Sequence, residues 1–238
     1  GIDAKELALS RESMEAEERS DELEGTRDLQ KNADERVNQF QRKLRAISKE
    51  RNLVALADVS TNTNDEELVY REFDLREGLR EALVDAGNLY LWSTDDVNIN
   101  GHGFLWQSKR MQDFNRAWQY FNEATIVVRN KRKMLQSMGD RCRLDQRGIR
   151  HHQRELLLLQ GRAVTNRGIA RLRLWQEQRK TEWLHEAVGD FDEACSRMKH
   201  LCEQSCSDVS LDGLAALDHE LLALGLKALA TRWKGKAL

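Results

Sequence analysis

The sequence predicts an all-α fold, and three observations carry that prediction. The 238-residue chain contains no proline, the residue that breaks helix interiors, although ordinary usage would give roughly a dozen. Valine and isoleucine are scattered, and no hairpin turn lies between alternating apolar runs. Two similar segments, Ala117 to Ala124 and Ala187 to Ala194, each place alanine, an aromatic residue and alanine on one helical face. We expect about seven helices, most of them paired antiparallel through short loops.

Residues 1–57 are predicted to form one long, charged N-terminal helix. Mostly apolar residues recur at every seventh position along it, and such a line forms one half of a coiled-coil seam. The companion positions three residues later are polar up to Thr26 and apolar from Ala33 onward. The first half is therefore expected to project or to lie on a partner, and the second half to pack on the body. A solvated helix that contacts nothing is the alternative. The line consists of Ile2, Leu9, Ala16, Leu23, Gln30, Val37 and Leu44.

Residues 65–238 are expected to form one α-helical domain with a basic helix inserted near 129–160. A polar break at 58–66 separates this domain from the N-terminal helix. The dipeptide Gly139–Asp140 predicts a kink or a short turn, and Gly161 predicts the end of the basic helix, because glycine commonly follows the last helical residue. The predicted helices cover 68–92, 104–138, 141–160, 162–175, 182–206 and 211–233, with a loop at 93–103.

The segment 162–195 resembles a tetratricopeptide repeat, a family of stacked helical hairpins. Asparagine, glycine and alanine match the first helix of that repeat, and alanine, an aromatic residue and alanine match the second. A weaker second unit would pair the segment Leu79–Leu91 with the helix that carries the earlier alanine–aromatic–alanine pattern. The resemblance implies a stack of hairpins with an extended concave binding surface. The matching residues are Asn166, Gly168, Ala170, Ala187, Phe191 and Ala194, and in the second unit Ala117, Phe121 and Ala124.

The chain also departs from the tetratricopeptide pattern. Nineteen residues separate Gly168 from Ala187, and thirty separate Gly87 from Ala117, whereas the family spacing is about twelve within a repeat of roughly 34 residues. The proline that often closes a repeat is absent. The family interpretation is therefore a degenerate array with insertions, and an irregular helical bundle is the alternative.

Charge is distributed unevenly although the net charge is only −2. Residues 1–28 carry a net charge of −6, and residues 129–154 carry +7. The basic segment has a stripe of arginines on one helical face, and arginine binds carboxylates or phosphates through two parallel hydrogen bonds. No aromatic residue occurs between Phe121 and Trp175, although single-stranded nucleic acid usually stacks on aromatics. An acidic protein surface is therefore the expected partner. A merely solvated face is the first alternative, and RNA or anionic lipid is the second. The stripe is Arg143, Arg147, Arg150 and Arg154.

No motif for catalysis, phosphate binding or metal binding occurs in the sequence. Three cysteines share one helical face, which favours buried structural thiols over a metal site that needs ligands on several sides. We therefore expect no catalytic residue, no metal and no cofactor. An α-helical enzyme whose residues are far apart in sequence is kept as an alternative. These cysteines are Cys195, Cys202 and Cys206.

The sequence thus predicts a non-enzymatic scaffold for protein–protein interactions, a structural subunit of a larger complex. The expected contact residues are the arginine stripe and the apolar positions Ile2, Leu9 and Leu23. An RNA-associated helical adaptor that uses the segment 129–154 is the main alternative. Apolar runs are too short for a membrane span. Four cysteines without a dense disulfide pattern favour a reducing intracellular compartment, and a mitochondrial or other organellar protein without its transit peptide is the second expectation.

Overall fold

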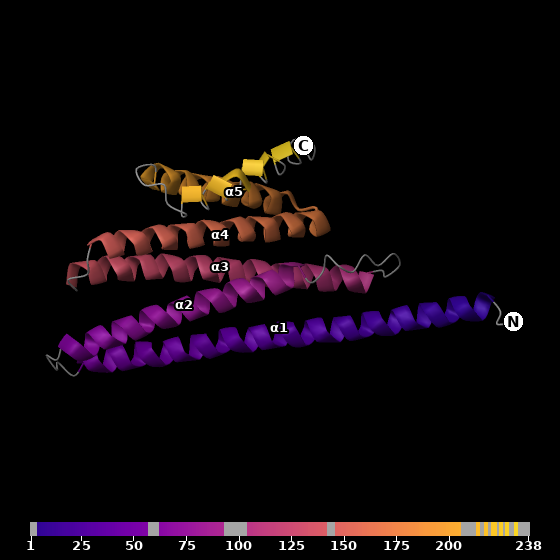
Figure 1. Cartoon of the computed structure of the whole chain (residues 1–238), viewed down its shortest axis with the longest axis horizontal. Helices are drawn as coiled ribbons and strands as arrows, with labels where there is room; N and C mark the ends of the chain where they lie inside the picture. The colour runs from indigo at the N-terminus through magenta and orange to yellow at the C-terminus, as the bar shows by residue number, and fades with distance from the viewer. Residues whose placement is uncertain are drawn as a thin grey trace.

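The computed structural model describes residues 4–56, 62–92, 104–141 and 146–205, together with helical positions between 213 and 232. Five long helices follow one another along these ranges, and the positions after 213 form a short C-terminal helix beside α5 (Figure 1). The prediction of an all-α fold with a long N-terminal helix is confirmed. The long helices are α1 (Ala4–Leu56), α2 (Asn62–Trp92), α3 (Phe104–Arg141), α4 (Gln146–Gln178) and α5 (Thr181–Ser205).

The predicted helix boundary at Gly161 is wrong, because the two helices expected on either side of it are the single helix α4. Gly161 is buried in the middle of α4, where an added Cβ would collide with the side chain of Met198 from α5. The glycine therefore permits close approach of two helices instead of ending one. The dipeptide Gly139–Asp140 likewise lies in the last turn of α3, which continues through Arg141.

Each helix packs antiparallel against the next one in the chain, so that the five form a layered stack (Figure 1). Side chains also connect helices that are not consecutive in the chain. Such contacts join α1 with α3, α2 with α4, and α3 with α5. The bridges are Tyr120 Oη to Asp34 Oδ1 at 2.6 Å, Asn166 Nδ2 to Asn88 Oδ1 at 3.4 Å, and the rings of Trp118 and Trp183 with centroids 5.8 Å apart.

The helix α1 uses only part of its length for this packing. Gln30, Val37 and Ile47 are buried, and the ring of Phe40 lies against Gly78 of α2. At 1.5 Å per residue, the 53 residues of α1 span about 80 Å and the 31 residues of α2 about 46 Å. The N-terminal part of α1 accordingly extends past the ends of the other helices (Figure 1).

Two helix interfaces in the stack share one packing geometry. The ring of Phe121 in α3 lies against Gly87 of α2, and the ring of Phe191 in α5 lies against Gly168 of α4. In both cases a Cβ added to the glycine would lie 2.7 Å from a ring carbon. Buried alanines flank each ring, so the backbones approach closely where the ring fills the gap. The flanking residues are Ala117, Ala124, Ala187 and Ala194, all fully buried.

The connection between α4 and α5 is short and well defined. Arg179 has a φ of +57°, the left-handed conformation that commonly ends a helix. Its N–H donates to the carbonyl of Trp175 at 2.7 Å, and its guanidinium lies 5.3 Å from the centre of the Trp175 ring. The chain then reverses into α5, whose first turn carries Glu182, a favourable charge at a helix N-terminus.

Candidate functional site

A buried carboxylate and two arginines connect α4 and α5. Asp190 receives hydrogen bonds from Arg167 Nη2 at 2.7 Å and from Arg171 Nη1 at 2.6 Å. Burial raises the pKa of Asp190, although both guanidinium groups act in the opposite direction. Removing one partner of a buried ion pair usually costs far more than the pair contributes. This cluster therefore fixes the register of α5 on α4.

The same cluster extends as a chain of polar contacts across three helices. Arg167 also donates to Asn122 of α3 at 3.1 Å and contacts Glu193 at 3.2 Å. Glu193 accepts from Arg197 at 2.6 Å, and Arg197 donates to the buried Gln160 at 3.0 Å. Every member is committed to another part of the stack, which is typical of a structural network.

A second cluster joins the first three helices around Asp34 of α1. Its carboxylate accepts from Tyr90 Oη at 3.0 Å, from Arg116 Nη1 at 2.8 Å and from Tyr120 Oη at 2.6 Å. Burial and the neighbouring carboxylate raise the pKa of Tyr120. Burial also raises the pKa of Tyr90. Tyr90 and Tyr120 therefore stay protonated and donate to Asp34. The cluster clamps α1 against both α2 and α3.

A third cluster places buried charges between α2 and its two neighbours. Lys131 of α3, whose side chain is only 4% exposed, pairs with Glu77, and its ammonium lies 4.0 Å from the centre of the Phe73 ring. Glu72 accepts from Arg76 at 2.6 Å and from Arg51 of α1 at 2.5 Å. Burial alone would raise the pKa of Glu72, but the two arginines outweigh it and lower the pKa.

The basic stretch at residues 129–133 is not one continuous basic surface. Arg129 and Lys133 are exposed, whereas Lys131 is buried in the third cluster. Arg132 is half-buried, and burial together with the nearby Arg197 lowers its pKa. Two of the four basic groups thus face the inside of the stack.

The predicted arginine stripe is only partly within the described structure. Arg150 and Arg154 lie on α4, the first exposed and the second half-buried, and both take part in interactions with other groups. Arg143 and the side chain of Arg147 lie outside the described residues, as do the side chains of Ile2, Leu9 and Leu23. The structure therefore neither brings these predicted contact residues together nor separates them.

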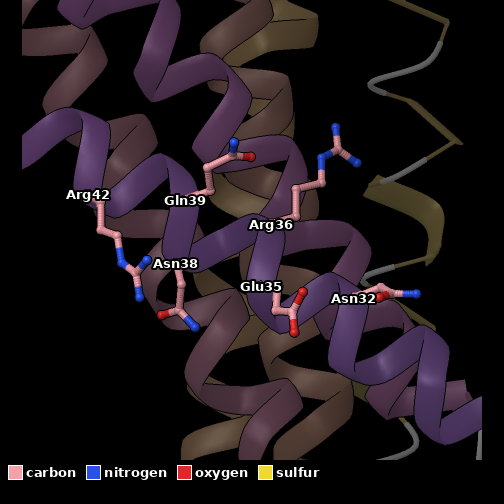
Figure 2. A pocket seen from close by; sticks show the side chains of 6 residues that line it. All are labelled: Asn32, Glu35, Arg36, Asn38, Gln39 and Arg42. Carbon is pink, nitrogen blue, oxygen red and sulfur yellow. The ribbon is translucent and has the colours of Figure 1, made fainter.

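A shallow hollow of about 610 Å³ lies on the outer side of α1 (Figure 2). Its described lining is polar and exposed, and Arg36 in this lining also pairs with Asp85 of α2 at 3.2 Å. Figure 2 shows that the side chains come from successive turns of this one helix. A single helical face does not enclose a substrate, so the hollow is a polar surface. The lining residues are Asn32, Glu35, Arg36, Asn38, Gln39 and Arg42.

The C-terminal helix carries exposed leucines that the sequence analysis did not single out. Leu214, Leu217, Leu221 and Leu224 are 44–60% exposed. A contiguous apolar surface on a protein is typical of an interaction site, whereas scattered exposed leucines are ordinary. The signal was present in the sequence as a heptad spacing, but composition alone did not distinguish it from a buried helix face.

Metal binding finds no support within the described ranges, where no three His, Cys, Asp or Glu side chains are grouped to hold an ion. Cys195 and Cys202 are half-buried, and burial raises the pKa of the Cys195 thiol. Cys142 and Cys206 lie outside the described residues. None of the helices in the described part of the chain is long and apolar enough to cross a membrane.

Comparison with known proteins assigns no family to this chain. No protein-family model matches the sequence, and no curated protein is significantly similar to it. One similar solved structure is a designed helical filament described as "DHF58 filament". It shares 15% sequence identity at a TM-score of 0.37, and the match covers 92% of this chain and 100% of that chain. At this TM-score we draw nothing further from the likeness.

Proposed function

We propose that the protein is a non-enzymatic scaffold that binds other proteins as a subunit of a larger assembly. The observation that carries this proposal is the N-terminal part of α1, which extends past the other helices (Figure 1). Most of the stability of a helix in a protein comes from packing of its apolar face. A partner that packs along this extension would bury its apolar positions.

The sequence of the extension fits such a partner. Ile2, Leu9 and Leu23 lie on a seven-residue line, and the first 28 residues carry a net charge of −6. Apolar positions on one side of an acidic helix suit a helical partner with basic flanks. The three internal charge clusters support the same proposal, because they hold the remaining helices as a rigid platform behind the extension.

The tetratricopeptide-like interpretation belongs to this proposal as well. The repeated contact of an aromatic ring with a glycine, Phe121 with Gly87 and Phe191 with Gly168, supports a repeated hairpin unit. The helices of 25–53 residues exceed what a repeat of roughly 34 residues can hold in two helices. We therefore propose elongated hairpins of that general kind, which offer a broad face for protein partners.

An RNA adaptor is the weaker alternative. Nucleic-acid binding depends on basic side chains that reach phosphates, and Lys131 is instead committed to Glu77 inside the stack. The arginine stripe is better suited to acidic protein surfaces, because no aromatic residue accompanies it.

Affinity purification of the tagged full-length chain tests the proposal. Partners would be identified by mass spectrometry at moderate salt, with and without nuclease. The informative variant combines Leu9→Lys and Leu23→Lys, which places charges on the apolar line of the extension. Leu53→Lys is the matched control, because Leu53 lies on the same helix outside the extension and is 67% exposed.

The scaffold proposal expects a defined set of proteins that survives nuclease, is retained by Leu53→Lys and is lost from the double variant. Loss of partners after nuclease treatment would replace the scaffold with the RNA adaptor. Partners that bind the double variant and the control equally would contradict the role of the extension.

A further inference from the structure

The C-terminal helix carries a continuous apolar line that no other part of the described structure covers. Four leucines are spaced three, four and three residues apart, and Ala228 follows four residues later, also exposed. This is the a/d spacing of a coiled-coil seam. We call these residues the C-terminal seam: Leu214 (58% exposed), Leu217 (46%), Leu221 (60%), Leu224 (44%) and Ala228.

The C-terminal helix has a defined place on the stack. Lys227 pairs with Asp192 of α5, and the C-terminal helix lies alongside α5 at the edge of the molecule opposite α1 (Figure 1). The seam is therefore presented on an element that is held to the body. Stacked helical proteins normally end in a polar outer face, and this edge ends in leucines instead.

The charges beside the C-terminal seam indicate which molecule binds to it. Asp218 and Glu220 flank its N-terminal half, and Lys227 and Arg232 flank its C-terminal half. We propose that the seam binds the seam of a second copy of this chain in antiparallel orientation, as a two-fold symmetric dimer. This proposal is independent of the scaffold function, because it uses the opposite edge of the molecule.

The antiparallel register follows from the heptad positions. With Leu221 and Leu224 in the a and d positions, Leu221 of one copy packs on Leu224 of the other, and the two-fold axis passes beside Leu222. Leu222 is itself 48% exposed. In this register Glu220 of each copy faces Lys227 of the other, so the same attractive pair occurs twice.

A parallel arrangement is disfavoured by the same charges. It would place Lys227 of one copy opposite Arg232 of the other, two like charges, and would leave Glu220 opposite Gly225. Like-charge pairs across a coiled coil select against an arrangement. The order of charges along the helix therefore favours one orientation of the second copy.

Sedimentation analysis of the full chain over a concentration series tests the proposal. We expect the mass to rise from 27.6 kDa to twice that value as concentration increases. The variant L221E/L224E is expected to remain a monomer. The control L29E/L53E also replaces two exposed leucines and is expected to dimerise as the unchanged chain does. Circular dichroism of each variant verifies that the helices are retained.

Mixing two charge variants tests the orientation. E220K alone places a second lysine opposite Lys227 and is expected to weaken the dimer. K227E places two glutamates opposite each other, and it is combined with D192K so that an attractive pair to α5 is kept. Mixed together, the two variants restore an attractive pair at each contact that the single variants lose, and they are expected to form a heterodimer more strongly than either forms a homodimer. In a parallel dimer E220K would have no effect.

Three results would overturn the proposal. The first is a chain that stays monomeric at every concentration. The second is a dimer that survives L221E/L224E but is lost in L29E/L53E. The third is hydrogen exchange that shows the seam protected in the monomer by the chain's own residues 1–28, which would make the occupant an intramolecular one.

Discussion

At the scale of single residues, two glycines show how closely the helices approach. Gly168 of α4 faces the fully buried ring of Phe191 and the Cβ of Asp190, so an added methyl group has no space. Gly189 of α5 has no atom within 4 Å of its Cβ position. Both glycines lie within helices. A comparison of their substitutions by alanine therefore separates the effect of packing on stability from the effect of helix propensity.

We expect Gly168→Ala to lower the free energy of unfolding by ~1–3 kcal/mol through overpacking. Gly189→Ala is the matched control and is expected to raise it by ~0.5–1 kcal/mol, because alanine is the better helix former. Urea denaturation followed by circular dichroism measures both. Equal effects of the two substitutions would mean that the ring of Phe191 does not limit the α4–α5 distance.

The carboxylate of Glu72 makes the stability of the folded protein depend on pH. Burial acts to raise its pKa, but Arg76 and Arg51 lower the pKa below its usual value in the folded protein. Its contribution to stability is therefore complete above the unfolded pKa of about 4.3 and is lost as the pH falls through the lower folded pKa. Glu72→Gln is expected to cost ~1–3 kcal/mol at neutral pH and to reduce the acid dependence of unfolding.

Urea denaturation at a series of pH values from neutral to strongly acidic measures this effect. Glu67→Gln is the control, because Glu67 lies on the same helix and is exposed. If the stability of Glu72→Gln and that of the unchanged chain fell in parallel throughout the acid range, the ion pairs of Glu72 would not stabilise the folded state.

Residue-level chemistry was the part that the sequence predicted least. The partners in the buried clusters are far apart in the chain, such as Asp34 with Tyr120 and Lys131 with Glu77. No local spacing encodes such pairs, so the sequence predicts a basic surface at 129–133 although Lys131 is buried. The predicted helix end at Gly161 is wrong for the same reason, because the role of this glycine depends on Met198 in another helix.

At the scale of helices, the sequence was more informative because helical periodicity is local. The apolar companion line from Ala33 onward predicted that the second half of α1 packs on the body, and the burial of Val37 and Ile47 confirms it. The alanine–aromatic–alanine spacing likewise lies on buried faces of α3 and α5. The predicted helix ends at 92, 104, 182 and 206 agree with the structure to within one residue. The boundary at Gly161 does not, because the role of that glycine depends on a contact between helices.

The two halves of α1 should differ in their effect on stability. Deletion of residues 1–25 is expected to shift the thermal midpoint by no more than about 2 °C, because surface changes are usually within about 0.5 kcal/mol. Phe40→Ala, in the half that packs on α2, is expected to cost roughly 2–4 kcal/mol. Thermal and urea unfolding followed by circular dichroism compare the two variants. A large loss of stability on deletion would show that the extension packs on its own chain.

At the scale of the whole molecule, the stack has two unlike edges. One edge is α1 with its acidic extension, and the other is the C-terminal helix with its apolar seam (Figure 1). The all-α architecture was predictable because the absence of proline and the helical periodicities agree across the chain. The contacts between non-consecutive helices were not predictable, because they join residues far apart in the sequence. Trp118 and Trp183, for example, are 65 residues apart.

The consecutive packing of the helices also bears on how the chain folds during synthesis. Each helix packs on the one made just before it, so contacts are local in sequence, a topology that favours rapid folding. The cluster around Asp34 needs only α1, α2 and α3, and it can close while α4 is still inside the ribosome. The stack would then be built outward from α1, with the seam of the C-terminal helix emerging after α5.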